Sequence, residues 1–133
     1  MSNSESPAKV WYEANCHCGA IKYRVNVPSL ETQKVTNCNC SICCKNGYLN
    51  VYPKRTDVVF HKGEDHMKGY LFGEKRCMHK FCPTCGSSLF VDPHMDDPEL
   101  IVVNVRMFKD IDVDKLELWK YDGFNRLQPR YDV

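Results

Sequence analysis

The chain has 133 residues, 43% of them hydrophobic, and its 18 lysines and arginines nearly balance 17 aspartates and glutamates, for a formal charge of +1. This length predicts one domain, and this charge gives no large basic face for nucleic acid or an anionic membrane. Its apolar runs, such as residues 100–103, are too short for a membrane span or a signal peptide, so we expect a cytoplasmic location, with the nucleus as a possible additional one.

The elements predicted in chain order are mostly short strands. Residues 1–10 are polar and predict a flexible N-terminal tail, which leaves a single domain over residues 11–133. Over residues 20–27 apolar and polar side chains alternate, which is the period of a half-buried strand. A short turn of helix is expected after Cys40. Similar short runs predict further strands at residues 48–52, 58–61, 70–72, 88–91 and 100–108.

Turn-rich segments separate these runs, and no long helical period competes with them. The predicted fold class is therefore mainly β, with small antiparallel sheets joined by hairpins in an open sandwich or barrel. Two layers of short strands in so small a chain bury little surface, which makes a structural metal a reasonable source of stability.

Nine cysteines are the outstanding feature of the composition. In a chain without a secretory signal we expect reduced thiols, and an odd number would leave one cysteine outside any disulfide framework. Reduced cysteines that cluster in the sequence indicate metal binding. The alternative is a set of buried structural cysteines without metal.

Two of the cysteine groups form knuckle-like pairs, early and late in the chain. Each pair can place two thiolates on one metal from a tight turn, and each is followed directly by a glycine that tolerates a positive φ. Four thiolates predict a closed structural zinc site that joins distant strands. The alternative is that the pairs bind separate metals or none. The predicted ligands are Cys16, Cys18, Cys82 and Cys85.

The third group combines C-x-C and C-x-x-C spacing over Cys38, Cys40 and Cys43. Three thiolates can bind one zinc and leave its fourth position open for a substrate thiolate, which is the arrangement of a catalytic site. Cys44 follows directly, and a loop could turn it inward. A closed structural site of four cysteines is therefore the alternative here.

Several other residues carry weaker expectations. Cys77 lies in an alternating stretch and is predicted to be a strand residue packed in the core. His17 and His79 could support the metal ligands or act as acid and base, although a lone histidine is more often a surface residue. Four cations are candidates for carboxylate contacts, with solvated surface charges as the alternative: Lys45, Lys54, Arg55 and Arg106.

The motifs Cys-His-Cys-Gly-Ala at 16–20, Cys-Asn-Cys-Ser-Ile-Cys at 38–43 and Phe-Cys-Pro-Thr-Cys-Gly-Ser at 81–87 give the chain a family resemblance. It resembles the glutathione-dependent formaldehyde-activating enzymes, a family that includes the centromere protein V type. The resemblance implies the family's β-tent fold and a formaldehyde-activating-enzyme-like zinc-binding domain over residues 11–133. It also implies two zinc ions, a structural one on the outer pairs and a catalytic one on the middle three cysteines.

The activity implied is the addition of glutathione to formaldehyde, which is formally the reverse of a carbon-sulfur lyase reaction. Our leading hypothesis is an enzyme in which Cys38, Cys40 and Cys43 are the catalytic site for a small thiol such as glutathione and a small electrophilic carbon substrate. One alternative is a non-catalytic zinc module that binds protein or chromatin, which the lack of a basic stretch disfavours. Another is a redox sensor whose middle cysteines oxidise and release metal.

Overall fold

A computed structural model of the chain describes residues 8–72, 75–93, 96–127 and 133. Short strands dominate it, so the predicted mainly β fold class is confirmed. Within the described residues no helix has the length and apolar character needed to cross a membrane. The strands are β1 Lys9–Asn15, β2 Lys22–Pro28, β3 Val35–Cys38, β4 Asn50–Val51, β5 Val58–Lys62, β6 Lys68–Tyr70, β7 Met78–Phe81, β8 Ser88–Asp92, β9 Val102–Asn104 and β10 Leu118–Tyr121.

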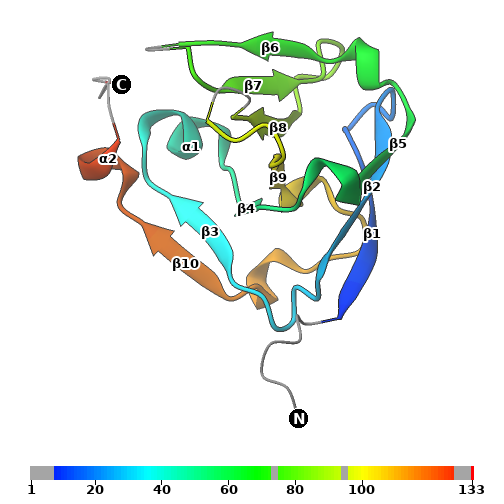
Figure 1. The fold of residues 1–133 in the computed structure, drawn as a ribbon, viewed down its shortest axis with the longest axis horizontal. Helices are drawn as coiled ribbons and strands as arrows, with labels where there is room; N and C mark the ends of the chain where they lie inside the picture. The colour runs from blue at the N-terminus through cyan, green and yellow to red at the C-terminus, as the bar shows by residue number, and fades with distance from the viewer. Residues whose placement is uncertain (1–7, 73–74, 94–95, 128–132) are drawn as a thin grey trace.

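The helices are short and lie at the connections between strands. The α-helices are α1 Ser41–Asn46 and α2 Gly123–Arg126, and the 3-10 helices are η1 Arg55–Asp57, η2 Glu64–His66, η3 Val105–Met107 and η4 Val113–Lys115. The turn of helix expected after Cys40 is thus α1. Figure 1 shows α1 and α2 at one side of the molecule, beside the ends of β3 and β10.

The strands form two sheets. The smaller sheet has the order β1-β2-β5, and the larger one has the order β10-β3-β4-β9-β8-β7-β6. All pairings between the described strands are antiparallel except β10 with β3, which is parallel with Tyr121 opposite Cys38. The expectation of hairpin connections therefore fails for β10 with β3, and also for β2 with β5 and β4 with β9, because these pairings join strands that do not follow one another in the sequence.

Several predicted strand boundaries differ from the structure. The strand expected over residues 100–108 ends at Asn104, because the Asn104 side chain accepts a hydrogen bond from the Arg106 amide and starts η3. The strand expected at 48–52 is only β4, and β6 overlaps the strand expected at 70–72 only at Tyr70, because it begins two residues earlier. β1 includes Lys9 and Val10, so the end of the predicted tail is strand, while residues 1–7 lie outside the described part of the chain.

The hydrophobic core lies between the two sheets. Tyr23 of β2 and Phe90 of β8 pack with ring centroids 4.9 Å apart, and Phe60 of β5 completes the aromatic contact at 5.6 Å from Tyr23. Alternate residues of the larger sheet point into this core, among them Val35, Val51, Phe90 and Val103.

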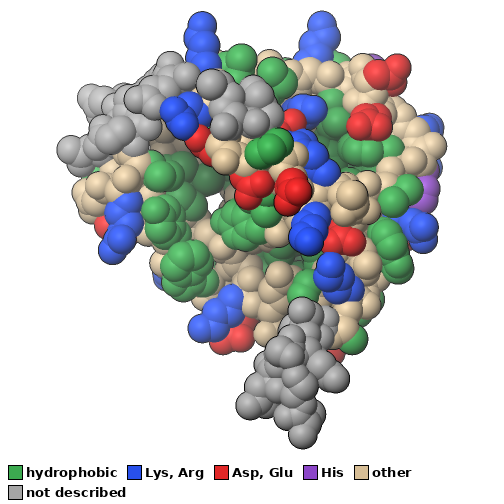
Figure 2. All heavy atoms as spheres, viewed as in Figure 1, with side chains coloured by type: hydrophobic (Ala, Val, Ile, Leu, Met, Phe, Trp, Pro, Cys, Tyr) green, Lys and Arg blue, Asp and Glu red, His purple; other side chains and the backbone are tan. Residues whose placement is uncertain are grey.

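The opposite face of the larger sheet carries a different set of side chains. Their neighbours in sequence, Thr36, Asn50, Val91 and Val102, line a cavity on that face. Because side chains alternate along each strand, one face of the larger sheet packs in the core and the other lines the cavity. Figure 2 shows that the face seen in Figure 1 is hollowed near its middle, between groups of hydrophobic side chains.

Candidate metal centres

The first candidate centre is a cluster of four cysteine thiols. Their sulfur atoms all lie within 4.8 Å of one another, and Cys18 Sγ is 3.7 Å from both Cys16 Sγ and Cys82 Sγ. Cys16 and Cys82 are completely buried. Two loops supply them, the one between β1 and β2 and the one between β7 and β8. The structure thus brings together the predicted set Cys16, Cys18, Cys82 and Cys85.

The two loops that present these thiols have the same local design. In the first, the Gly19 amide donates to the Cys16 carbonyl at 3.1 Å, and in the second the Gly86 amide donates to the Cys82 carbonyl at 2.8 Å. Gly19 and Gly86 have φ of 79° and 80°, the left-handed region that favours glycine. The Ile21 amide also donates to Cys16 Sγ at 3.4 Å. These are the tight turns expected from the glycines after each pair.

The pKa values of these thiols indicate that all four can be deprotonated together only if a cation lies between them. The Ser87 hydroxyl hydrogen bond lowers the pKa of Cys85 to about 5, so one thiolate forms readily. For Cys18, a hydrogen bond from the Ala20 amide lowers the pKa, but burial and hydrogen bonds with neighbouring cysteines outweigh it and raise the pKa to about 11. A divalent cation would supply the charge that full deprotonation requires, and four soft thiolates suit zinc.

The second candidate centre is formed by Cys38, Cys40 and Cys43, whose sulfur atoms also lie within 4.8 Å of one another. Cys38 ends β3, Cys40 is the N-cap of α1, and Cys43 lies one turn into that helix. The Cys40 amide donates to Cys38 Sγ at 3.4 Å. The α1 helix therefore closes the C-x-C-x-x-C sequence into one cluster.

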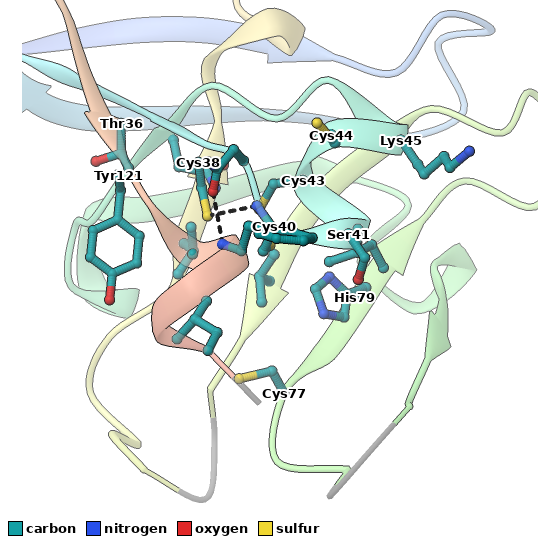
Figure 3. A pocket seen from close by; sticks show the side chains of 18 of the residues that line it. Thr36, Cys38, Cys40, Ser41, Cys43, Cys44, Lys45, Cys77, His79 and Tyr121 are labelled. Atoms are coloured by element: carbon teal, nitrogen blue, oxygen red, sulfur yellow. Dashed lines mark hydrogen bonds between the residues drawn. The ribbon is translucent and has the colours of Figure 1, made fainter. Parts of the chain in front are cut away.

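Cys44 does not join this cluster. Its side chain is exposed, and Figure 3 shows it turned away from Cys38 and Cys40. Consecutive residues of a helix point in different directions, so α1 directs Cys43 inward and Cys44 outward. In this structure the group is the three-cysteine arrangement, and the alternative with a fourth cysteine is not formed.

Charge is also concentrated on one thiol of this cluster. The hydrogen bond from the Cys43 thiol lowers the pKa of Cys40 to about 5. The same contact raises the pKa of Cys43, and burial raises the pKa of Cys38. Cys38 and Cys43 therefore keep their protons while Cys40 carries the negative charge. The four-cysteine cluster likewise has one thiol that ionises readily and another that does not. This donor set also fits zinc or another soft divalent cation.

The three-cysteine cluster opens onto a cavity of about 540 Å³ on the outer face of the larger sheet. That volume lies in the range of small-molecule sites. Figure 3 shows the cluster, His79 and Tyr121 around this space. The residues around it include Thr36, Cys38, Cys40, Cys43, Asn50, Tyr52, Phe72, His79, Val91, Val102, Tyr121 and Phe124.

His79 is buried in this cavity wall, with 8% of its surface exposed. Its Nδ1 lies 3.3 Å from the Tyr48 hydroxyl, and burial lowers its pKa to about 4, which keeps the imidazole neutral at pH 7. The ordinary expectation of a surface histidine is therefore wrong for His79. His17, in contrast, is exposed.

The remaining candidates are divided between the cavity and other surfaces. Cys77 lies just before β7 and lines the cavity, so the prediction that it packs in the core is wrong. Lys45 also lines the cavity. Arg106 borders a second hollow of about 390 Å³, where its Nε donates to the Gly47 carbonyl at 2.6 Å. Arg55 is paired with Asp92.

Sequence reasoning missed several cavity residues, among them Thr36, Asn50 and Tyr121. Asn50 is 5% exposed, and its Oδ1 has no hydrogen-bond partner among the described residues. Thr36 lies two residues before Cys38 on β3, and Asn50 and Tyr121 are the cross-strand neighbours of Thr36 and Cys38. The period of two from Cys38 could have identified Thr36, but only the strand pairing reveals the other two.

Comparisons with known proteins agree with this architecture. A family model described as glutathione-dependent formaldehyde-activating enzyme matches residues 11–121. A Halomonas elongata protein named for glutathione-dependent formaldehyde activation is 35% identical over 103 residues, covering 67% of this chain. The chain spans 60% of that relative's length. A crystal structure of a Rhodobacter sphaeroides protein superposes with a TM-score of 0.67 at 25% identity, covering 80% of this chain and 98% of that one.

Proposed function

This chain belongs to the glutathione-dependent formaldehyde-activating enzyme family, and from that membership we propose that it joins a small thiol such as glutathione to a small electrophilic carbon. With formaldehyde as the carbon substrate the product is S-(hydroxymethyl)glutathione. The reverse direction breaks the same bond and is a carbon-sulfur lyase reaction. The observation that carries the proposal is the cluster of Cys38, Cys40 and Cys43 at the wall of a cavity of about 540 Å³.

In this proposal the two cysteine clusters have different roles. Cys38, Cys40 and Cys43 would hold a zinc ion beside the cavity, and the four cysteines of the outer cluster would hold a second one inside the fold. When bound at three protein thiolates, zinc keeps a substrate thiol deprotonated near neutral pH. Cys40 contributes to this charge balance because its own thiolate forms at low pH.

The cavity would orient the two substrates. Its walls combine the apolar side chains of Val91, Val102 and Phe124 with a few polar groups, which is the usual composition of a small-molecule site. Such walls exclude water and hold the thiol close to the carbon, which removes much of the entropic barrier to their reaction. Lys45 lies on the border of the cavity, where its ammonium can contact a carboxylate of glutathione.

The proposal is tested by the variant Cys40→Ser, with Cys44→Ser as the matched control. A serine oxygen is a poorer zinc ligand than a thiolate, so Cys40→Ser should lose the metal beside the cavity and with it calorimetric binding of glutathione. Its free energy of unfolding should stay within about 2 kcal/mol of wild type, because the outer cluster is intact. Cys44→Ser should retain two zinc ions and wild-type binding.

Circular dichroism and zinc content, measured at equal loading of the outer cluster, accompany the binding experiment. A folded Cys40→Ser protein that binds glutathione as wild type does would show that the three-cysteine cluster is irrelevant to the thiol. Collapse of the fold in this variant would instead make the cluster structural. Either result contradicts the proposed function.

A further inference from the structure

Beside the three-cysteine cluster lies a chain of hydrogen bonds that the proposed function does not use. Asn46 Nδ2 lies 3.3 Å from the Tyr48 hydroxyl, which in turn lies 3.3 Å from His79 Nδ1. An amide nitrogen only donates, so the Tyr48 oxygen accepts from Asn46, and its single hydrogen is left to be donated, with Nδ1 of His79 within reach. A neutral imidazole that accepts at Nδ1 carries its proton on Nε2. The contacts of Tyr48 therefore favour the tautomer of His79 with its proton on Nε2.

The Nε2 atom of His79 faces a different environment. Within the described parts of the chain no side chain or backbone group is hydrogen-bonded to it, and His79 lines the same cavity as Cys38, Cys40 and Cys43. Figure 3 shows the imidazole and the cluster facing this common space. A polar group that borders a cavity can satisfy its hydrogen-bonding capacity with a ligand bound there. This N–H is thus available to an acceptor in the cavity.

The rest of the wall holds the ring in place. His79 lies on β7 opposite Val91 of β8, and its ring centroid is 5.3 Å from that of Phe72 and 6.0 Å from that of Tyr48. The same burial that lowers the pKa of His79 keeps it a neutral donor at the pH where thiolates form. A donor held before the reaction needs no reorganisation when charge develops on its acceptor.

We propose that His79 is a catalytic residue of the proposed reaction, whose Nε2–H donates a hydrogen bond to the oxygen of the carbonyl substrate. This role rests on the proposed function. As the thiolate sulfur adds to the carbonyl carbon, a carbon-sulfur bond forms and the electron pair of the C=O π bond moves to oxygen. The oxygen then takes a proton from water, while the proton of the starting thiol has left to solvent, so His79 keeps its own. Tyr48 is the positioning residue that holds the tautomer.

The decisive experiment compares His79→Phe with His79→Gln in the zinc-loaded full-length protein. Phenylalanine keeps the ring packing and removes the donor, so kcat for hydroxymethylglutathione formation should fall about 100-fold, as for other lost oxyanion donors. KM for glutathione should stay within about twofold, because the thiol does not bind His79. Glutamine keeps an N–H donor, so kcat of His79→Gln should be at least about tenfold higher than kcat of His79→Phe. His66→Phe, at an exposed histidine of η2, should leave kcat unchanged.

A second measurement determines the tautomer of His79 and does not depend on enzymatic activity. Nitrogen-15 NMR of the wild-type imidazole should show the proton on Nε2 of His79, and Tyr48→Phe should release the other tautomer. A proton on Nδ1 in the wild type would overturn the proposal, as would wild-type kcat in His79→Phe or equal loss in His79→Phe and His79→Gln. Failure of the proposed function looks different, because wild-type protein would then neither bind nor turn over glutathione.

Discussion

Cys40 and His79 share one cavity, and both have lowered pKa values with opposite effects on charge. The Cys43 hydrogen bond lowers the pKa of Cys40 to about 5 and favours a charged thiolate. Burial lowers the pKa of His79 to about 4 and favours a neutral imidazole. At neutral pH the cavity wall therefore combines an anionic protein thiolate with an uncharged imidazole.

The buried His79 also makes stability depend on pH. Its pKa is about 4 in the folded chain and about 6.5 when unfolded, so the unfolded chain binds more protons between these values. The stability from a neutral His79 is fully present above pH 6.5 and is lost as the pH falls toward 4. Between pH 7 and pH 5 the wild type should lose about 1–2 kcal/mol more than His79→Phe, after allowance for partial screening.

Urea unfolding of the two proteins at equal zinc content measures this difference. Both lose zinc as their cysteines protonate, so the difference between them isolates His79. If the free energy of unfolding changed equally with pH in wild type and His79→Phe, the fold would not be holding His79 neutral.

At the level of elements, α2 closes the three-cysteine cluster from the side. Gly123, the first residue of α2, is buried, and a Cβ placed on it would come within 2.5 Å of Cys38 Sγ and 2.9 Å of Cys40 Cβ. The Asn39 side chain accepts a hydrogen bond from the Phe124 amide at 2.8 Å and holds the helix there. The parallel pairing of β10 with β3 brings this helix to the cluster.

Gly123→Ala should therefore weaken metal binding at the three-cysteine cluster while leaving the fold intact. The added methyl group displaces Cys38 Sγ, and such a disturbance around a metal ligand typically costs about 10-fold to 100-fold in affinity. Competition with a chromophoric chelator measures the affinity of each zinc. Arg126→Ala, at an exposed position of the same helix, is the control and should match wild type. Unchanged affinity in Gly123→Ala would contradict the close packing of α2 on the cluster.

Across the whole molecule, the four-cysteine cluster connects the two sheets. Cys16 and Cys18 follow a strand of the smaller sheet, and Cys82 and Cys85 lie between two strands of the larger one. A metal at this point joins segments more than sixty residues apart, since Cys18 and Cys82 are separated by 64 positions. Structural zinc supplies about 10 kcal/mol or more of apparent folding free energy, comparable to the entire stability of a typical domain.

Cys82→Ser should consequently unfold or aggregate the protein. Cys77→Ser, which changes a half-buried thiol outside both clusters, should alter the free energy of unfolding by no more than about 1 kcal/mol. Thermal melts of the two variants, followed by circular dichroism, test the ranking. The reverse order of stability would show that the outer ligands are wrongly identified.

The sequence by itself determined the parts of this protein that depend on short spacings. Cys38, Cys40 and Cys43 lie within one loop and the first turn of α1, so their clustering follows from local geometry. Gly19 and Gly86 mark the tight turns for the same reason. The alternation that predicted β2 was likewise a local signal.

Only the tertiary structure decided which distant segments meet. Alternation tells which face of a strand a side chain occupies, but not which strand lies beside it, because backbone hydrogen bonding between strands carries little sequence information. For that reason the parallel partner of β3, the exclusion of Cys77 from the core and the place of Asn50 in the cavity could not be predicted. His79 became a candidate for catalysis for the same reason, since the pairing of β7 with β8 places it in the cavity wall, and Tyr48, just before β4, lies beside its Nδ1.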